Sequence, residues 1–220
     1  MTMDDAVTQP TLRWGASMNG PASISPAFTY RAARRAAQAE GDQPQIYVAG
    51  AYTSAVSAAN DTIDASAGSV HAINGVISDQ SPWRQLLEDT ERALRLAGWS
   101  VFLPHRRVSY WGSREITPGE VAAECLAAVA SSDAVLAILG ESFGTHVEVG
   151  MALGLGIPTV VVRSKQRTES YFGSGVADSG FVAPLMLSDL RDLPSVVASG
   201  EFIAAYKQAM AKASALLPHN

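Results

Sequence analysis

The stretch "GESFGTHVEVGMALGLGIPTVVV", residues 140–162, decides the fold that the sequence predicts. A glycine-containing turn leads into a helix of small residues, and a proline then opens a continuous apolar run. Such a run is typical of a strand that is buried on both faces of a sheet. Another apolar run, "AVLAILG" at 134–140, precedes the turn. A strand, a helix and a strand in this order predict two parallel strands joined by a helical crossover.

The same alternation continues on both sides of this unit. We predict five strands, at 45–50, 99–105, 134–140, 158–163 and 181–187. We predict helices at 81–98, from Thr117 to about 132, from Thr145, and at 199–217. Strands that alternate with helices predict an α/β fold, a flavodoxin/Rossmann-like three-layer sandwich with a central parallel sheet of about five strands.

This pattern defines a single α/β domain over residues 45–217, and 220 residues with 47% hydrophobic content suffice for one sizeable core. Residues 1–40 form a predicted N-terminal extension, partly disordered, with a short helix at 26–40. Residues 51–80 are rich in small and polar residues without a clear period. An insert of that length is typically functional or disordered.

Composition excludes several classes of partner. The formal net charge is −5 and no basic stripe is present, which argues against polymeric nucleic acid and anionic membranes. No apolar run approaches the roughly 20 residues of a membrane span, and the N-terminus lacks the layout of a signal peptide. Cys125 is the single cysteine, so no internal disulfide is expected. We therefore predict a cytoplasmic protein. We also predict that it binds no metal, because no His/Cys/Asp cluster has metal-ligand spacing.

In open parallel sheets, ligands bind beyond the carboxyl ends of the strands. This rule directs attention to residues 50–53, 104–107 and 140–148. In the last range, Ser142, Gly144 and Thr145 surround a predicted helix N-terminus, where free N–H groups and the helix dipole favour an anion.

Glu148 lies one turn into this helix, where the positive helix end is expected to keep its carboxylate ionised. Two interpretations of Glu148 stay open on the pattern alone. It is a reagent, or it completes a capping box in "THVE" (145–148), with Thr145 as N-cap. Ser142 likewise either binds a ligand or only starts a turn.

Two stretches resemble motifs of a known family. "IYVAGAYTS" (46–54) and "SDAVLAILGESFGTHVEVGMALGLGIPTVVV" (132–162) resemble the nucleoside 2-deoxyribosyltransferase superfamily, closest in motif to its nucleoside 5′-monophosphate N-glycosidase branch. The resemblance covers about residues 45–163. It implies that Glu148 is the nucleophile, which attacks C1′ of the sugar, and that no cofactor is needed.

The residue six positions before the nucleophile bears on the substrate. In the resembled family it is typically aspartate in transferases that act on free nucleosides, and serine in the monophosphate N-glycosidases. Here it is Ser142. The resemblance therefore favours a substrate with a 5′-phosphate, which an aspartate would repel.

The sequence departs from the family in the preceding helix. The family's acid/base aspartate corresponds to Cys125, with Glu124 adjacent and Glu120 in the capping-box pattern "TPGE". A shift of one residue turns a side chain by about 100° around a helix. Glu124 is therefore a candidate acid/base only if the helix is rotated, and a solvated surface residue otherwise.

The other candidates lie at strand ends. The resemblance places sugar and nucleophile contacts at the first strand end, where Tyr47 fits the core equally well. These predicted substrate-binding residues are Tyr47, Gly50, Ala51 and Tyr52. After the second strand, His105 and Arg107 are predicted to bind substrate, because an arginine can grip a phosphate.

The sequence thus predicts an N-glycosidase that hydrolyses a nucleoside 5′-monophosphate through a covalent glycosyl–Glu148 intermediate. Two alternatives stay open: a base-exchanging nucleoside 2-deoxyribosyltransferase, and an inactive nucleotide-binding sensor or interaction module. The resemblance also implies a homodimer or a higher homo-oligomer.

Overall fold

The computed structural model describes residues 43–51, 77–140, 142–165 and 171–216. The predicted N-terminal extension, its helix at 26–40, Tyr52 and most of the predicted 51–80 insert lie outside the described residues.

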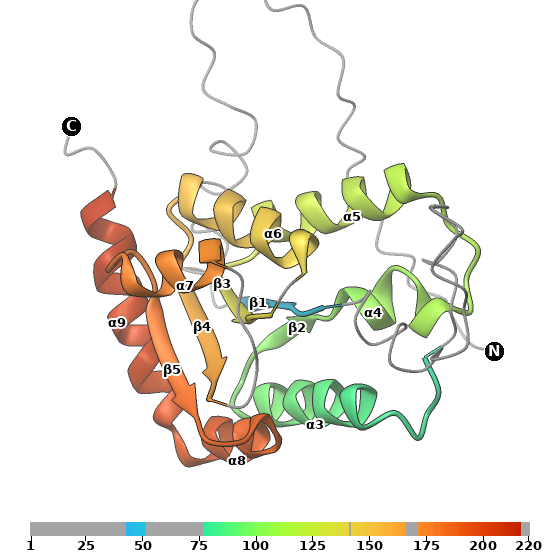
Figure 1. The fold of residues 1–220 in the computed structure, drawn as a ribbon, viewed down its shortest axis with the longest axis horizontal. Helices are drawn as coiled ribbons and strands as arrows, with labels where there is room; N and C mark the ends of the chain where they lie inside the picture. Colours follow the sequence, from blue (N-terminus) through green and yellow to red (C-terminus); the bar gives the residue numbers. More distant parts are fainter. Residues whose placement is uncertain (1–42, 52–76, 141, 166–170, 217–220) are drawn as a thin grey trace, which may run out of the picture.

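The centre of the described part is one sheet of five parallel strands. The strands are β1 (Gln45–Ala49), β2 (Ser100–Phe102), β3 (Ala134–Ile138), β4 (Thr159–Ser164) and β5 (Ala183–Leu187). Helices cover both faces of the sheet (Figure 1). The predicted α/β, flavodoxin/Rossmann-like three-layer fold is confirmed.

The strands lie in the order β2-β1-β3-β4-β5. The chain moves outward from β1 to β2, returns to β3 on the other side of β1, and continues to β4 and β5. The connections therefore diverge between β1 and β3, where Tyr47 is in register with Val135. A crevice for ligands is expected at this switch point, outside the carboxyl ends of the two strands.

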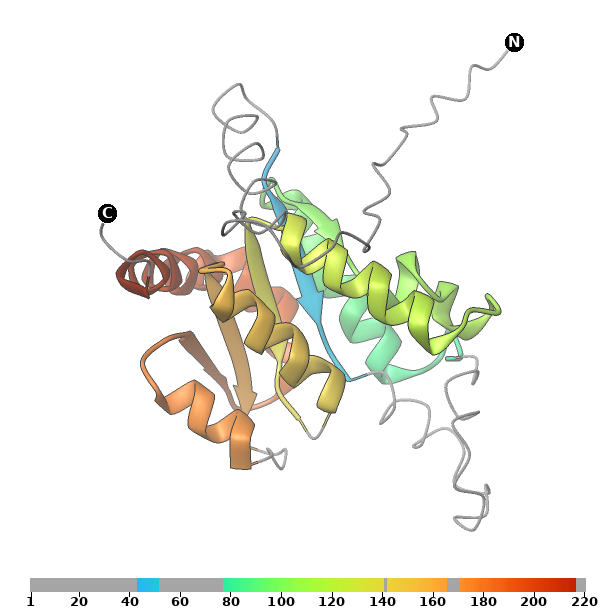
Figure 2. The same ribbon diagram turned by 90° about the horizontal axis from the view of Figure 1, so that it is seen from above.

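The helices form the two outer layers. One layer contains α3 (Pro82–Leu96), α8 (Leu193–Ser199) and α9 (Glu201–Leu216), and the other contains α5 (Pro118–Ser131), α6 (Phe143–Gly154) and α7 (Tyr171–Asp178). Two short helical turns, α4 (Pro104–Arg107) and η2 (Tyr110–Gly112), follow β2, and η3 (Leu190–Asp192) follows β5. Seen from above, α5 and α6 cross the sheet side by side (Figure 2).

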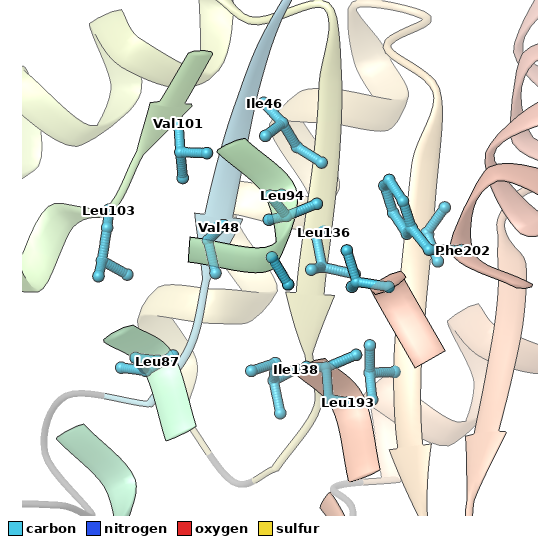
Figure 3. Close-up of a cluster of buried hydrophobic side chains, with 14 of the residues drawn as sticks. Ile46, Val48, Leu87, Leu94, Val101, Leu103, Leu136, Ile138, Leu193 and Phe202 are labelled. Carbon is cyan, nitrogen blue, oxygen red and sulfur yellow. The ribbon is translucent and has the colours of Figure 1, made fainter. Parts of the chain in front are cut away.

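Alternation along each strand divides the core in two. Ile46 and Val48 of β1 point toward α3, where they join Leu136 and Ile138 in the larger cluster with side chains of α8 and α9 (Figure 3). Tyr47 and Ala49 point to the opposite face, toward α5 and α6. Successive side chains of a strand face opposite sides, so β1 presents only its odd-numbered residues to α6.

Several predicted boundaries differ from the structure. β2 ends at Phe102 rather than 105, because Pro104 occupies the first position of α4 and begins a helical turn. α6 begins at Phe143 rather than Thr145. The predicted helix at 199–217 is confirmed as α9, which begins at Glu201, after Gly200, whose left-handed φ of 89° ends the unpredicted helix α8. α7 was not predicted.

No helix within the described ranges is long and apolar enough to span a membrane.

Candidate active site

The candidate site lies at the carboxyl ends of β1 and β3, beneath the first turns of α6. Tyr47 of β1 is fully buried and faces α5 and α6. Its ring stacks on Phe102 of β2, with centroids 5.6 Å apart and an interplanar angle of 11°. The sequence left open whether Tyr47 belongs to the core or to the site. The structure places its ring in the core and its hydroxyl at the predicted nucleophile.

Glu148 meets this hydroxyl. The Tyr47 hydroxyl donates a hydrogen bond of 2.5 Å to Glu148 Oε1. Burial raises the pKa of Glu148 to about 7, although the hydrogen bond from Tyr47 acts in the opposite direction. The expectation that the helix end keeps Glu148 ionised is therefore wrong as stated, since desolvation dominates. Burial and the neighbouring Glu148 also raise the pKa of Tyr47 well above its usual value, so the phenol stays a donor.

The capping-box interpretation of Glu148 is wrong. Ser142, not Thr145, is the N-cap of α6, and its hydroxyl accepts a weak hydrogen bond of 3.5 Å from the Thr145 backbone N–H. Glu148 lies within the helix and uses its carboxylate to accept from Tyr47. The predicted turn role of Ser142 is thus real, and a ligand role for Ser142 stays a prediction.

The start of α6 presents further polar groups. Helix geometry leaves the first N–H groups of α6 without intrahelical acceptors. Thr145 is 1% exposed, and its Oγ1 has no hydrogen-bond partner among the residues that the structure describes. Gly144 is exposed, and a Cβ there would lie 3.8 Å from Ser142 Oγ, which is an ordinary contact. A buried hydroxyl without a partner is costly, so Thr145 has hydrogen-bonding capacity to offer a ligand.

The structure separates Cys125, which stands at the family's acid/base position, from the candidate Glu124. Cys125 is 7% exposed and packs in the same cluster as Tyr47. Burial raises the pKa of its thiol to about 11, so the thiol is neutral beside Tyr47 and Glu148. Glu124 is more exposed and lies 3.6 Å from the guanidinium of Arg114. A catalytic role for Glu124 stays a prediction.

The predicted contacts after β2 also differ in accessibility. His105 is 2% exposed, and burial lowers its pKa to about 4, with the backbone of Ala51 acting in the opposite direction. Arg107 is exposed. Ala51 is buried, and Gly50 is partly buried at the end of β1. Substrate contacts by these residues are not tested by the structure, but burial makes a direct contact through the His105 ring less favourable.

One residue at this edge was missed. A Cβ at Gly50 would lie 3.2 Å from Trp83 Cζ2, so Trp83 of α3 packs tightly against the end of β1. This close approach explains a glycine at position 50. The signal in the sequence is a tryptophan in the first turn of the predicted helix at 81–98.

The arrangement joins a partly buried carboxylate, a phenol donor and a helix N-terminus at the switch point of a parallel sheet. Residues 80–186 match the family model described as nucleoside 2-deoxyribosyltransferase. Over this range the chain is similar to the nucleoside 2-deoxyribosyltransferase family. The matched range holds α5, β3, α6 and β4, and hence Glu148.

A solved structure, that of BlsM, shares this fold. The solution structure of BlsM is 20% identical, with a TM-score of 0.55, and the match covers 76% of this chain and 91% of BlsM. The structure of the CMP N-glycosidase BcmB from Clostridium botulinum is 15% identical, with a TM-score of 0.45, and the match covers 69% of this chain and 95% of BcmB. None of the curated proteins matches the chain.

Proposed function

We propose that this protein is an N-glycosidase that hydrolyses the base–sugar bond of a nucleoside 5′-monophosphate. The observation that carries the proposal is the 2.5 Å hydrogen bond from Tyr47 to Glu148 at the switch point of the sheet. Within the described residues, no cationic side chain pairs with Glu148. A carboxylate that is neither neutralised by a cation nor spent on a helix cap is available as a nucleophile.

In the proposed reaction, an oxygen of ionised Glu148 attacks C1′ of the sugar. The C1′–N bond breaks, and its electron pair leaves with the base, which takes up a proton. Water then attacks C1′ of the glycosyl ester, loses a proton and releases the Glu148 carboxylate, as in retaining glycosidases. Tyr47 stabilises the ionised form before attack and the departing carboxylate after hydrolysis.

The start of α6 supports a 5′-phosphate as the distal group of the substrate. Ser142 and Thr145 supply hydroxyls, and the first turn supplies N–H groups and the positive end of the helix dipole. Phosphate and C1′ lie at opposite ends of a nucleotide's sugar. Binding of the phosphate at the helix start would thus leave C1′ near Glu148, one turn further along.

The base requires a proton as it leaves, and we retain Glu124 as the candidate donor. Its ion pair with Arg114 has to open for this role. Glu124→Gln is expected to lower turnover most for bases that are poor leaving groups. Glu120→Gln is the matched control, because Glu120 caps α5 through Thr117. Equal effects of both substitutions would remove Glu124 from the mechanism.

Chromatography of reaction products tests the activity. Purified protein is incubated with ribo- and deoxyribonucleoside 5′-monophosphates, with and without a second free base. Glu148→Gln is the test variant, and Glu201→Gln on the exposed start of α9 is the control. We expect free base from wild type and the control, and none from Glu148→Gln.

Other outcomes of this assay select the alternatives. A nucleotide that carries the added base would identify a base-exchanging transferase. Binding of nucleotide without turnover by folded wild-type protein would contradict the hydrolase and support a sensor.

We also propose that a second copy of the chain covers the outer face of α5 and α6. Phe143 is 87% exposed and Val147 is 58% exposed, one turn apart on α6. Apart from Glu148, α6 carries no acidic or basic side chain other than His146. Exposed aromatic and aliphatic residues on an otherwise uncharged helix face are typical of an interface. Val147→Glu is expected to convert a dimer to a monomer in light scattering, whereas a wild type that is monomeric at all concentrations would contradict this assembly.

A further inference from the structure

A cluster of Arg84, Trp111 and His105 lies beside the end of β1, outside the residues used in the proposed reaction. The Trp111 ring lies 5.7 Å from the His105 ring, and the Arg84 guanidinium lies 4.7 Å from the Trp111 ring centroid. Trp111 and His105 are 5% and 2% exposed. The three residues come from η2, α4 and the first turn of α3, so the cluster ties three segments together.

His105 connects the cluster to the strand that carries Tyr47. Its ring lies near the backbone of Ala51, which raises the pKa of His105 against the lowering by burial, and Ala51 follows the last residue of β1 by two positions. Ala51 is 1% exposed, and Trp83 packs on the neighbouring Gly50. The end of β1 is therefore held from α4 on one side and from α3 on the other.

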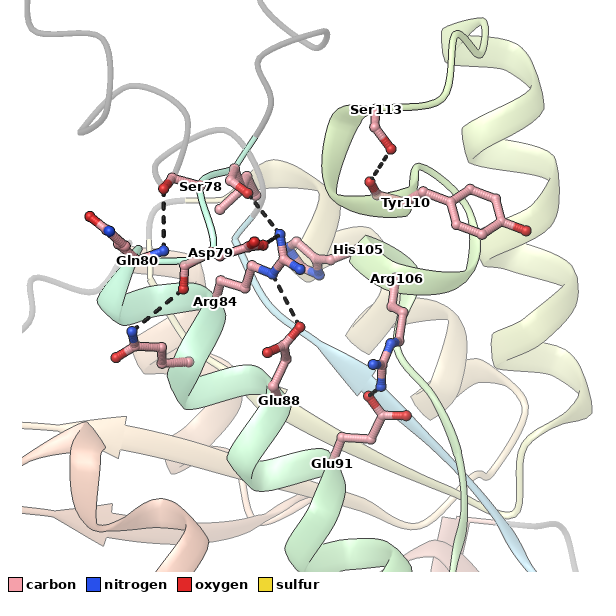
Figure 4. A network of polar contacts seen from close by, with 12 residues as sticks. Ser78, Asp79, Gln80, Arg84, Glu88, Glu91, His105, Arg106, Tyr110 and Ser113 are labelled. Atoms are coloured by element: carbon pink, nitrogen blue, oxygen red, sulfur yellow. Dashed lines mark hydrogen bonds and ion pairs between the residues drawn. The ribbon is translucent and has the colours of Figure 1, made fainter.

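Trp111 and Arg84 connect the cluster to Ile77. The Ile77 N–H donates to the Trp111 carbonyl at 2.8 Å, and Arg84 Nη1 donates to the Ile77 carbonyl at 3.1 Å. Arg84 also pairs with Asp79 and Glu88 (Figure 4). Ala51 and Ile77 are thus both fixed at one cluster, although 25 residues separate them in the sequence.

The backbone around Trp111 adopts a costly conformation to make these contacts. Tyr110 has φ 46° and Trp111 has φ 59°, and both are non-glycine residues in the left-handed region. Such a conformation is strained and persists where surrounding structure enforces it. Its result is that the Trp111 carbonyl meets Ile77 while the ring meets Arg84 and His105.

An ion pair between half-exposed Arg106 and buried Glu91 fixes α4 from the other side. Arg106 Nη1 donates to Glu91 Oε2 at 2.9 Å, and Glu91 is 2% exposed on α3 (Figure 4). His105 is therefore anchored through its own helical turn as well as through Trp111.

We propose that Arg84, Trp111 and His105 are positioning residues, which hold the Gly50–Ala51 end of β1 in the geometry that the reaction at Glu148 requires. The catalytic part of this proposal rests on the proposed function, since it assumes that Gly50 and Ala51 contact the sugar. Loss of the cluster would let the end of β1 move relative to Glu148. A misplaced sugar lowers the rate of the chemical step more than it lowers binding.

The test combines amide exchange with kinetics in the full chain. Exchange of the Ile77 N–H is measured by NMR in Trp111→Leu and Arg84→Lys, with Val161 in β4 as the internal reference. We expect Ile77 to exchange about tenfold faster or more while Val161 is unchanged, because Trp111→Leu removes the ring that Arg84 packs on and Arg84→Lys removes the guanidinium donor to the Ile77 carbonyl. Arg92→Lys is the matched control, since Arg92 lies on the same helix and pairs only with exposed Asp89.

His105 tests the link to the reaction. His105→Leu is expected to lower kcat about tenfold with a smaller change in KM, and His105→Gln, which keeps an N–H donor for Ala51, is expected to restore most of kcat. An unchanged exchange rate of the Ile77 N–H in Trp111→Leu and Arg84→Lys would contradict the claim that the cluster holds Ile77 in place. Normal kcat in folded His105→Leu would overturn its positioning role.

The two proposals can fail separately. A wild-type protein without turnover would contradict the proposed function. The exchange rate of the Ile77 N–H would still decide whether the cluster holds Ile77 beside the end of β1.

Discussion

Two glutamates have little contact with water but differ in the partners of their carboxylates. Glu91 lies on α3 and contacts α4, and Glu148 lies on α6. Glu91 uses both carboxylate oxygens: Oε1 accepts from Arg95 at 2.8 and 3.0 Å, and Oε2 accepts from Arg106 at 2.9 Å. Glu148 accepts one hydrogen bond from a neutral phenol. Both carboxylates are desolvated, but only the first is neutralised by cations.

The difference separates a structural carboxylate from the proposed nucleophile. Glu91 accepts hydrogen bonds from two guanidinium groups, and the bond from Arg106 joins α3 to α4. Burial without a cation instead raises the pKa of Glu148 to about 7. The carboxylate is then ionised for part of the population near neutral pH and is poorly solvated, which favours attack on a carbon centre.

The largest expected effect is that of Glu148→Gln on stability. The folded-state pKa of Glu148, about 7, lies above the ordinary value of 4.5. Between these values the folded state keeps a proton that the unfolded state releases, so stability falls as pH rises from about 4.5 to about 7 and is flat above. Gln carries no charge, so we expect the variant to be more stable at pH 8 by on the order of 2–3 kcal/mol. Urea unfolding at pH 5 and pH 8 measures this, and an equal stability difference at both values would contradict the desolvated carboxylate.

Glu91→Gln is expected to act in the opposite direction. It leaves Arg95 and Arg106 without their carboxylate, and the fold should lose about 2 kcal/mol of unfolding free energy. Asp89→Asn, which removes the exposed pair with Arg92, should change stability by less than about 0.5 kcal/mol. Denaturant midpoints compare Glu91→Gln with Asp89→Asn. An unchanged free energy of unfolding in Glu91→Gln would mean that the pair between Glu91 and Arg106 does not hold α4.

Tyr47→Phe tests the hydrogen bond that Tyr47 donates to the Glu148 carboxylate. Loss of the donor removes stabilisation of the ionised form, so the pKa of Glu148 should rise further above about 7. The acidic limb of the pH–rate profile should move to higher pH by about one unit, equivalent to about 1.4 kcal/mol. Tyr110→Phe, at an exposed tyrosine, should leave the profile in place. An unchanged pH–rate profile would show that the hydrogen bond from Tyr47 does not affect the pKa of Glu148.

Tyr110→Asn has the smallest expected effect. Tyr110 has φ 46° and its side chain is 58% exposed, and asparagine tolerates the left-handed region better than tyrosine. We expect stability to rise by about 0.5–1 kcal/mol without loss of turnover. A rise in the thermal midpoint measures this, and a fall would show that the Tyr110 ring makes a stabilising contact.

The sequence predicted the fold well because its signals are local. Each strand is an apolar run beside a helix with a clear cap, such as Thr117 and Glu120, whose predicted capping box is present. Helix α7 escaped prediction because Gly173 and Gly175 weaken its pattern. The start of α6 was misplaced because "THVE" matches a capping box that tertiary contacts with Tyr47 override.

The site was predictable in its members but not in its electrostatics. The rotation of about 100° between adjacent helix residues indicated that Glu124 and Cys125 point in different directions. In the structure Cys125 is the buried one. The pKa of Glu148 was misjudged because it depends on burial under α5 and α6, which no local pattern reveals. The cluster of Arg84, Trp111 and His105 depends on contacts between residues up to 27 positions apart, and its left-handed backbone has no sequence signature.

The hydrogen bond from Tyr47 to Glu148 spans 101 residues of chain. Its two partners come together only after β3 has paired with β1 and α6 has docked, which are non-local steps with a high cost in chain entropy. Refolding protein should therefore regain helical signal before it regains the environment of Glu148. The proposed glycosidase activity would then return only at the last step of folding. A chain with native secondary structure but slipped β1–β3 pairing would be inactive.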